Sequence, residues 1–329
     1  MANYPRVLCL GEILFDIISD QPGVAYEDVT AWTAYPGGAP ANVACALAKL
    51  GTPAGFVGCV GRDRPGEELV TLLKDIGVAT NGVQLHEALP TREIYVIRTA
   101  DGDRQFVGFG DRATDEFADT ALQGDKLPID QFAQADYLAL GTLELPYPET
   151  AQAIDRALAL AKQHDVKVVL DVNWRPMFWP QPEAAKATVL DFMQQAHILK
   201  VADEEAEWLF DTADPSAIAQ RLPNANIVLV TAGAKGCAYS ILGNQGHRAA
   251  FNVEVQETTG AGDGFLAGFL HQCAQGFAAL NAPEAAREAV TYACAVGALT
   301  TMKPGAIAAQ PTAAEVDEFL QARQAQQVP

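Results

Sequence analysis

The sequence predicts an α/β protein with a mostly parallel central sheet and a small appended β-sheet. Short apolar runs alternate with helical patterns along most of the chain, which is typical of parallel sheets covered by helices. Near residue 100, two strand-like segments follow each other without a helix between them. The 329 residues, of which 49% are hydrophobic, are enough for one large domain with an appendage.

The N-terminal third begins this alternation of strands and helices. Val7–Leu10 is a short apolar run that ends in a glycine, so we expect a buried strand there, and Phe56–Val60 is a second such run. Gly37-Gly38-Ala39-Pro40 opens a segment with helical apolar spacing, and Gly66–Ile76 is predicted to be the next helix.

The appended sheet is predicted from the consecutive strand-like segments. Thr91–Thr99 and Gln105–Phe109 flank Asp101-Gly102, which is a hairpin turn signal. Ile13–Ile18 and part of Trp32–Tyr35 are expected to join them. The chain is therefore treated as one unit with a main body of about residues 1–11, 37–90 and 111–329, and a small sheet of about residues 12–36 and 91–110.

From residue 136 onward the alternation is regular. The predicted strands are Tyr137–Leu140, Val166–Val172, Ile198–Val201 and Ile227–Thr231, with antiparallel additions at Cys237–Ile241 and Ala249–Val255. The predicted helices are Glu149–Gln163, Glu183–Gln195, Glu204–Phe210, Gly262–Gln275, Pro283–Thr301 and one that begins at Thr312 with a capping box to Glu315. Ligands of such sheets collect at the carboxyl ends of the strands.

The most informative motif lies near the C-terminus, where Thr258-Thr259-Gly260-Ala261-Gly262-Asp263 precedes a helical pattern. Small residues at a helix N-terminus leave backbone N–H groups free to hold a phosphate or a developing anion. The charge of Asp263 would repel such an anion, so we interpret this residue as a proton acceptor for a reaction at that site. The alternative is a glycine-rich turn in which Asp263 is an ordinary acid of the first turn.

Composition excludes several classes of function. The net charge of −19 argues against nucleic acid or an anionic membrane as a partner. Six cysteines without a CxxC favour core positions in a reducing compartment, and neither a signal peptide nor a membrane span is visible, so a cytoplasmic location is expected. The five histidines have no metal-ligand spacing, and the P-loop and dinucleotide fingerprints are missing.

Three motifs resemble one family. Gly37–Ala44, Thr258–Phe265 and Asp171-Val172-Asn173-Trp174-Arg175-Pro176 are similar to motifs of PfkB (ribokinase-like) carbohydrate kinases, and most similar to fructokinases. The resemblance covers nearly the whole chain. It implies a ribokinase-like three-layer sandwich with a β-sheet lid, and transfer of the ATP γ-phosphate to D-fructose to give fructose 6-phosphate. A kinase for 2-keto-3-deoxygluconate, ribose or another sugar stays open, as does a non-catalytic member that senses sugar or scaffolds a complex.

The resemblance implies roles for particular residues. Asp263 would be the catalytic base, and the backbone amides of Gly260, Ala261 and Gly262 would form an anion hole. The expected sugar-binding residues are Asp16, Gly37, Gly38, Asn42, Arg98, Arg112, Asn173 and Arg175. The expected nucleotide-binding residues are Thr231, Gly233, Lys235, Gly236 and Lys200.

The expected cofactors are ATP, Mg²⁺ and K⁺. Glu205 and Asp203 would organise Mg²⁺ through water, although Ala202 stands where the family often has asparagine. A monovalent cation would be held, mainly by backbone oxygens, at Glu257, Thr259, Thr300, Lys303 and Gly305. Glu257 replaces an aspartate that is common in the family. A homodimer through the lid is the one protein partner considered, beside the small-molecule sugar and ATP.

Several of these residues also have structural interpretations. Asp16, a lone acid in an apolar segment, is expected either to bind hydroxyls or to form a salt bridge with Arg6 or a lid arginine. Asp171 either caps a loop or pairs with Arg175. Trp174 and its neighbour Trp179 are expected to be packing groups.

Overall fold

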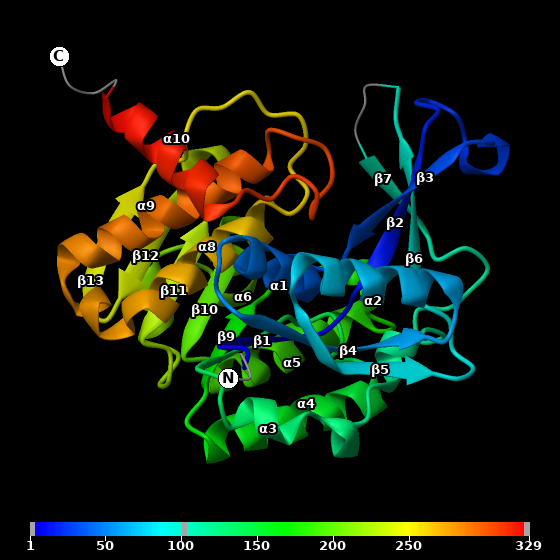
Figure 1. Cartoon of the computed structure of the whole chain (residues 1–329), viewed down its shortest axis with the longest axis horizontal. Coiled ribbons are helices and arrows are strands. Elements are labelled where there is room, and N and C mark those ends of the chain that lie inside the picture. The colour runs from blue at the N-terminus through cyan, green and yellow to red at the C-terminus, as the bar shows by residue number, and fades with distance from the viewer. Residues whose placement is uncertain (1–3, 101–103, 326–329) are drawn as a thin grey trace.

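The computed structural model describes residues 4–100 and 104–325, and its centre is a nine-stranded sheet (Figure 1). The strand order is β13-β12-β11-β10-β9-β8-β1-β4-β5, and every neighbouring pair from β11 to β5 is parallel. The strands are β1 (Val7–Leu10), β4 (Ala54–Gly61), β5 (Ala79–His86), β8 (Tyr137–Leu140), β9 (Lys167–Asp171), β10 (Ile198–Ala202), β11 (Ile227–Thr231), β12 (Cys237–Ile241) and β13 (Asn244–Arg248).

Helices cover both faces of this sheet, which makes three layers (Figure 1). They are α1 (Ala39–Lys49), α2 (Arg64–Ile76), α3 (Ile129–Phe132), α4 (Pro148–Gln163), α5 (Ala185–Phe192), α6 (Asp203–Phe210), α7 (Pro215–Ala219), α8 (Ala261–Gly276), α9 (Pro283–Thr300) and α10 (Ala313–Ala325). The layers follow from strand geometry, because successive side chains point to opposite faces. In β1, Leu8 belongs to the hydrophobic cluster that includes Ile154 of α4, whereas Val7 and Cys9 belong to the cluster that includes Phe269 of α8.

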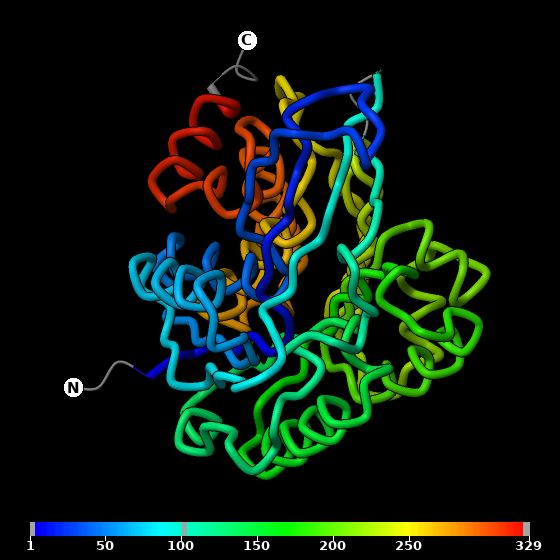
Figure 2. The backbone as a smooth tube through the Cα atoms, turned by 90° about the vertical axis from the view of Figure 1, so that its right-hand side faces the viewer, coloured from blue at the N-terminus to red at the C-terminus, as the bar shows by residue number. Residues whose placement is uncertain are grey.

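A second sheet of four strands is connected directly to the carboxyl end of β1, and we call it the lid. Its order is β3-β2-β6-β7, formed by β2 (Leu14–Ser19), β3 (Trp32–Gly37), β6 (Glu93–Arg98) and β7 (Arg104–Gly108). The tube view shows the lid extending along one side of the body (Figure 2). The predicted fold class, an α/β body with a small β-sheet, is confirmed. The predicted turn at Asp101-Gly102 lies outside the described residues.

Two details of the predicted strands differ from the structure. The predicted strand Ala249–Val255 is wrong, because this segment has no regular secondary structure and β13 occupies Asn244–Arg248 instead. The hairpin begins earlier because Leu242 (φ 48°) and Gly243 (φ 87°) form a tight turn with two positive φ angles, which suits the twist of paired strands. The strand β5 (Ala79–His86) was not predicted, because polar residues interrupt its apolar pattern.

All six cysteines are buried and free, which agrees with their predicted core positions. In the described part of the chain, no helix combines the length and the apolar character needed to cross a lipid bilayer.

Candidate active site

Asp263 lies in the first turn of α8, where Gly260 is the N-cap residue with a φ of 78°. A β-branched or bulky residue would be strained in that conformation. The side chain of Asp263 is buried, and its Oδ2 atom accepts a hydrogen bond of 2.8 Å from Nδ2 of Asn42. Asn42 precedes Asp263 by 221 positions in the sequence, so the fold brings two predicted motifs into direct contact.

Asn42 is held rigidly at the start of α1. Its backbone N–H donates to the carbonyl of Gly38 at 2.8 Å, and its carbonyl accepts from Nε2 of Gln310 at 2.8 Å. Its Oδ1 atom is buried and has no hydrogen-bond partner among the described residues. Buried polar atoms in proteins are nearly always paired, so this oxygen is suited to a hydroxyl of a bound ligand.

The environment of Asp263 suits a proton acceptor. Burial raises the pKa of Asp263 above its ordinary value, while Asn42, Lys200 and Arg175 oppose that rise because they favour the carboxylate. A base with a raised pKa takes up a proton more readily at neutral pH than an exposed aspartate does.

Lys200 and Asp171 form a buried ion pair beside the same helix turn. They are register partners, with Lys200 in the middle of β10 and Asp171 at the end of β9. Nζ of Lys200 lies 3.0 and 2.9 Å from the two carboxylate oxygens of Asp171. A Cβ atom on Gly262 would lie 3.0 Å from Nζ, so the ammonium lies against the first turn of α8. The predicted alternative pair between Asp171 and Arg175 is therefore wrong.

The surroundings of the ion pair shift the pKa values of both partners upward. Burial raises the pKa of Asp171 to about 6 despite the neighbouring ammonium. Burial disfavours the charged form of Lys200, but the carboxylates of Asp171, Glu205 and Asp263 outweigh it and raise the pKa of Lys200. A positive charge is thus fixed next to the backbone amides that the sequence predicted as an anion hole.

Asp16 of β2 faces the same region. A Cβ atom on Gly37 would lie 2.8 Å from Oδ2 of Asp16, so a side chain at that position would cover the carboxylate. Burial raises the pKa of Asp16 to about 6, and the charges of Arg104 and Arg175 lower it. The alternative salt bridge to Arg6 is wrong, because the guanidinium of Arg6 binds Asp136, with Nε 2.6 Å from Oδ2.

Arg104 is a lid arginine that contacts the body beside the start of α8, and it was not predicted from the sequence. Its Nη2 lies 2.7 Å from Oε1 of Glu257, and its Nη1 donates to Oγ1 of Thr259 at 2.7 Å. Arg98 is its register partner on β6, and Arg112 follows β7 as an exposed residue. The sugar contacts of Arg98 and Arg112 stay predictions. An arginine at the first position of the edge strand β7 was the available signal.

The loop after β9 is fixed by Glu205. Its Oε1 accepts from the backbone N–H of Trp174 at 2.6 Å, and its Oε2 accepts from that of Ala202 at 2.8 Å. Asn173 adopts a φ of 42° in this loop, and Arg175 is exposed. The predicted sugar-binding loop is therefore attached to the β10–α6 corner.

The tryptophans of this region pack against each other. The ring of Trp174 stacks on Trp208 with centroids 4.7 Å apart, and its centroid lies 5.5 Å from that of Trp179. Their predicted packing role is confirmed.

The predicted nucleotide loop follows β11, which ends at Thr231, and forms a 3-10 turn over Gly233–Lys235 before Gly236. Lys235 is exposed, and its Nζ lies 3.8 Å from Oδ2 of Asp203. In residues 4–100 and 104–325, no group of three or more His, Cys, Asp or Glu side chains is suited to hold a metal. The Mg²⁺ roles of Asp203 and Glu205 stay predictions.

The segments predicted to hold a monovalent cation meet at Glu257. Its Oε2 accepts from the backbone N–H of Gly305 at 3.1 Å, and its own N–H donates to the carbonyl of Thr301. Thr300 is fully buried, and its hydroxyl donates to Val296 within α9. Nζ of Lys303 lies 3.7 Å from Oε1 of Glu315, so its side chain points to α10 and its backbone is the part that could face the predicted cation. Oxygen ligands of this kind suit a hard cation.

A search of protein-family models matches residues 5–313 to the pfkB family carbohydrate kinase model. The chain belongs to this family. Among curated relatives, "Probable fructokinase-6, chloroplastic" of Arabidopsis thaliana is 35% identical over 96% of this chain and 82% of its own length. "Fructokinase-1" of Zea mays is 34% identical, with 97% of this chain and 99% of the relative covered. The family establishes the protein as a sugar kinase that transfers a phosphoryl group to an alcohol.

Solved structures support the same conclusion. A crystal structure of fructokinase with bound ATP from Xylella fastidiosa superposes with a TM-score of 0.87 and 31% identity, covering 97% of this chain and 98% of the other. A double mutant of fructokinase from Vibrio cholerae O395, in a form with fructose, ADP and potassium ion bound, gives a TM-score of 0.82 and 28% identity, covering 96% and 98%. The ribokinase-like fold is thereby confirmed.

Proposed function

We propose that this protein transfers the γ-phosphate of ATP to the 6-hydroxyl of D-fructose. The observation that supports this most is the buried Asp263, which is hydrogen-bonded to Asn42 and directly follows Gly260, Ala261 and Gly262 at the start of α8. The fructokinases among the relatives, at 33–35% identity over nearly the whole chain, favour fructose among sugars.

In the proposed reaction, Asp263 accepts the proton of the sugar hydroxyl as that oxygen attacks the γ-phosphorus. The three amides at the start of α8, together with the ammonium of Lys200, stabilise the negative charge that develops on the transferred group. Asp16 and Asn42 orient the sugar through their oxygens, and Arg175 adds positive charge nearby. Phosphoryl transfer needs little covalent help from a protein, so positioning and electrostatics suffice.

We propose ATP, Mg²⁺ and K⁺ as the ligands of this site. A putative Ribokinase II from E. coli has been solved in complex with ATP and Mg²⁺, at 26% identity, and the Vibrio cholerae fructokinase with a potassium ion. Mg²⁺ would neutralise phosphate charge at Asp203 and Glu205. K⁺ would be held by backbone oxygens near Glu257, Thr259, Thr300, Lys303 and Gly305, and the nucleotide along Thr231, Gly233, Lys235 and Gly236.

We also propose a reducing, cytoplasmic setting and a homodimer. Six free cysteines support the first, since disulfides are rare in reducing compartments. Within residues 4–100 and 104–325, β3 and β7 are the edge strands of the lid. They support the second, because edge strands are templates for pairing with another chain. Sedimentation of the purified protein tests the dimer.

The test is ATP consumption across a panel of fructose, ribose and 2-keto-3-deoxygluconate, with Asp263→Asn alongside the wild type. We expect fructose to give the highest kcat/KM. Asp263→Asn should reduce kcat by about 10²–10⁴-fold while calorimetry shows unchanged ATP binding. A higher kcat/KM for another sugar would replace fructose as the proposed substrate. Unchanged turnover by Asp263→Asn would contradict the role of Asp263 as the base. No turnover by the wild type with any of the three sugars would contradict the proposed kinase activity.

A further inference from the structure

The guanidinium of Arg104 joins the lid to the body next to the proposed anion hole. Arg104 stands at the start of β7, and its two terminal nitrogens each make a 2.7 Å contact, with Oε1 of Glu257 and with Oγ1 of Thr259. Thr259 directly precedes Gly260, the N-cap of α8. The lid is therefore bonded to the residue that leads into the helix turn of the proposed site.

Glu257 extends this connection to a second loop. Its other carboxylate oxygen accepts the backbone N–H of Gly305 at 3.1 Å. Ala306 then packs on the anion-hole turn, because a Cβ atom on Gly260 would lie 2.9 Å from the Cβ of Ala306. One carboxylate thus links a lid arginine to both segments that support Gly260.

The segment that Arg104 contacts has little regular structure of its own. Residues 249–260 lie in neither a helix nor a strand, and the N–H groups of Gln256 and Glu257 share the carbonyl of Thr301 as acceptor. Such a segment depends on side-chain contacts for its position. The side chain of Glu257 is only 14% exposed and that of Arg104 is 31% exposed, so the pair is better shielded than an ordinary surface salt bridge.

We propose that Arg104 is a positioning residue, which holds the anion-hole turn in its working geometry only while the lid is seated on the body. The proposal rests on the proposed function. It assigns Arg104 an effect on the phosphoryl-transfer step through Glu257 and Thr259, in addition to any electrostatic effect on Asp16. A displacement of about 1 Å at a reacting group can reduce the rate by about 10²-fold, so a loosened turn should lower kcat.

The test is a double-mutant cycle of Arg104→Met and Glu257→Gln, with kcat and the KM values for fructose and ATP measured for each variant. Each single change should lower kcat at least about tenfold. The double variant should be little worse than the worse single, because both remove one connection. Hydrogen exchange of the amides in residues 257–264 should become faster in Arg104→Met, a readout that does not depend on turnover.

The matched control is Arg64→Met, which removes an exposed arginine that lies 2.7 Å from Glu68 outside the lid. It should leave kcat and exchange in residues 257–264 unchanged. Arg104→Lys keeps a positive charge but cannot contact Glu257 and Thr259 through two separate nitrogens in the same geometry. Its kcat should lie between those of Arg104→Met and the wild type. Thermal unfolding of every variant establishes that it is folded.

Three results would overturn the proposal. These are a raised KM for fructose with unchanged kcat, independent and multiplicative effects in the cycle, or unchanged exchange in residues 257–264. None of these results would change the turnover of fructose by the wild type. Rejection of this proposal is therefore distinguishable from rejection of the proposed function.

Discussion

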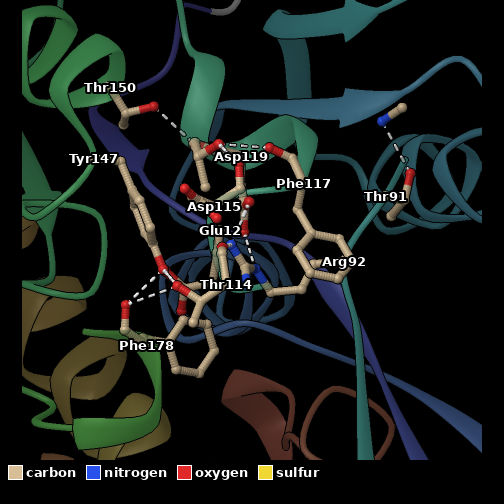
Figure 3. Close-up of polar contacts among 12 residues, drawn as sticks. Glu12, Thr91, Arg92, Thr114, Asp115, Phe117, Asp119, Tyr147, Thr150 and Phe178 are labelled. Atoms are coloured by element: carbon tan, nitrogen blue, oxygen red, sulfur yellow. Dashed lines mark hydrogen bonds and ion pairs between the residues drawn. The ribbon is translucent and has the colours of Figure 1, made fainter. Parts of the chain in front are cut away.

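Two buried ion pairs, each between a basic side chain and an aspartate, lie in different parts of this molecule. Arg92 and Asp119 pair below the lid, with side chains 0% and 3% exposed (Figure 3). Lys200 and Asp171 pair near the carboxyl ends of β10 and β9, with side chains 8% and 6% exposed. A buried ion pair is weak evidence for stability in itself, because desolvation can exceed the attraction. Its surroundings therefore decide what it does.

The pair below the lid is enclosed by structural groups. Nε and Nη2 of Arg92 contact the two oxygens of Asp119 at 2.5 and 2.8 Å, and Nη2 also donates to the carbonyl of Thr114. The guanidinium carbon lies 4.5 Å from the ring centroid of Phe117 and 5.0 Å from that of Phe178. Asp119, Thr114 and Phe117 belong to the segment after the lid, and Phe178 belongs to the loop after β9, so this pair fastens the start of β6 to the body.

The pair at the strand ends has a different environment. Lys200 has Asp171 as its hydrogen-bond partner, and Asp263 and Glu205 are close enough to raise its pKa. Its ammonium lies against Gly262 rather than against aromatic rings. We therefore predict that the guanidinium in its aromatic enclosure supports the fold, and that the lysine beside a helix N-terminus acts in the proposed phosphoryl transfer.

The largest effect is expected from Arg92→Met, which leaves Asp119 as an unpaired buried carboxylate. We expect a loss of about 3–5 kcal/mol in the free energy of unfolding, measured with denaturant. Replacing both partners, as in Arg92→Met with Asp119→Leu, should recover part of that loss. Stability unchanged in the single variant would show that this pair does not fasten the lid.

The next largest effect is expected from Lys200→Met. Removing a fixed positive charge beside the anion hole should lower kcat by about 10²-fold. The loss of stability should be smaller than for Arg92→Met, because Asp171, with a pKa already raised to about 6, can take up a proton when its partner is removed. If Lys200→Met kept its kcat but unfolded as easily as Arg92→Met, the two pairs would be alike in function.

The smallest effect concerns Asp16, whose raised pKa of about 6 gives sugar binding a pH dependence. Below pH 6 the carboxylate becomes protonated and loses its capacity to accept two hydroxyl hydrogen bonds. The Kd for fructose, measured by calorimetry without ATP, should rise by up to about tenfold per pH unit below 6 and level off above it. Asp16→Asn should bind fructose weakly at every pH. A wild-type Kd that is flat from pH 5 to 8 would contradict a role of this carboxylate in sugar binding.

Local patterns predicted the elements that depend on local rules. Val7–Leu10 was predicted as a buried strand because it is a short apolar run that ends in a glycine. The strand at Ala79–His86 was not predicted because it is an edge strand of the sheet and carries polar side chains. The false strand at Ala249–Val255 arose because alternation is found in extended loops as well as in paired strands.

The residues of the candidate site were also predicted where a local motif marks them and missed where none does. Asp263, Gly260 and Asn42 were predicted because their motifs are short and contiguous, although the hydrogen bond between the first and last could not be seen from positions so far apart. Arg104 was missed because a single arginine on a lid strand has no motif.

The sequence by itself determined the α/β class, the lid and the helix turn before Asp263, since apolar periodicity and glycine placement act within a few residues. Only the tertiary structure decided that Lys200 rather than Arg175 pairs with Asp171, and that Arg104 reaches Glu257. Such choices among charged partners depend on strand register and on the seating of one sheet against another, which no local pattern contains.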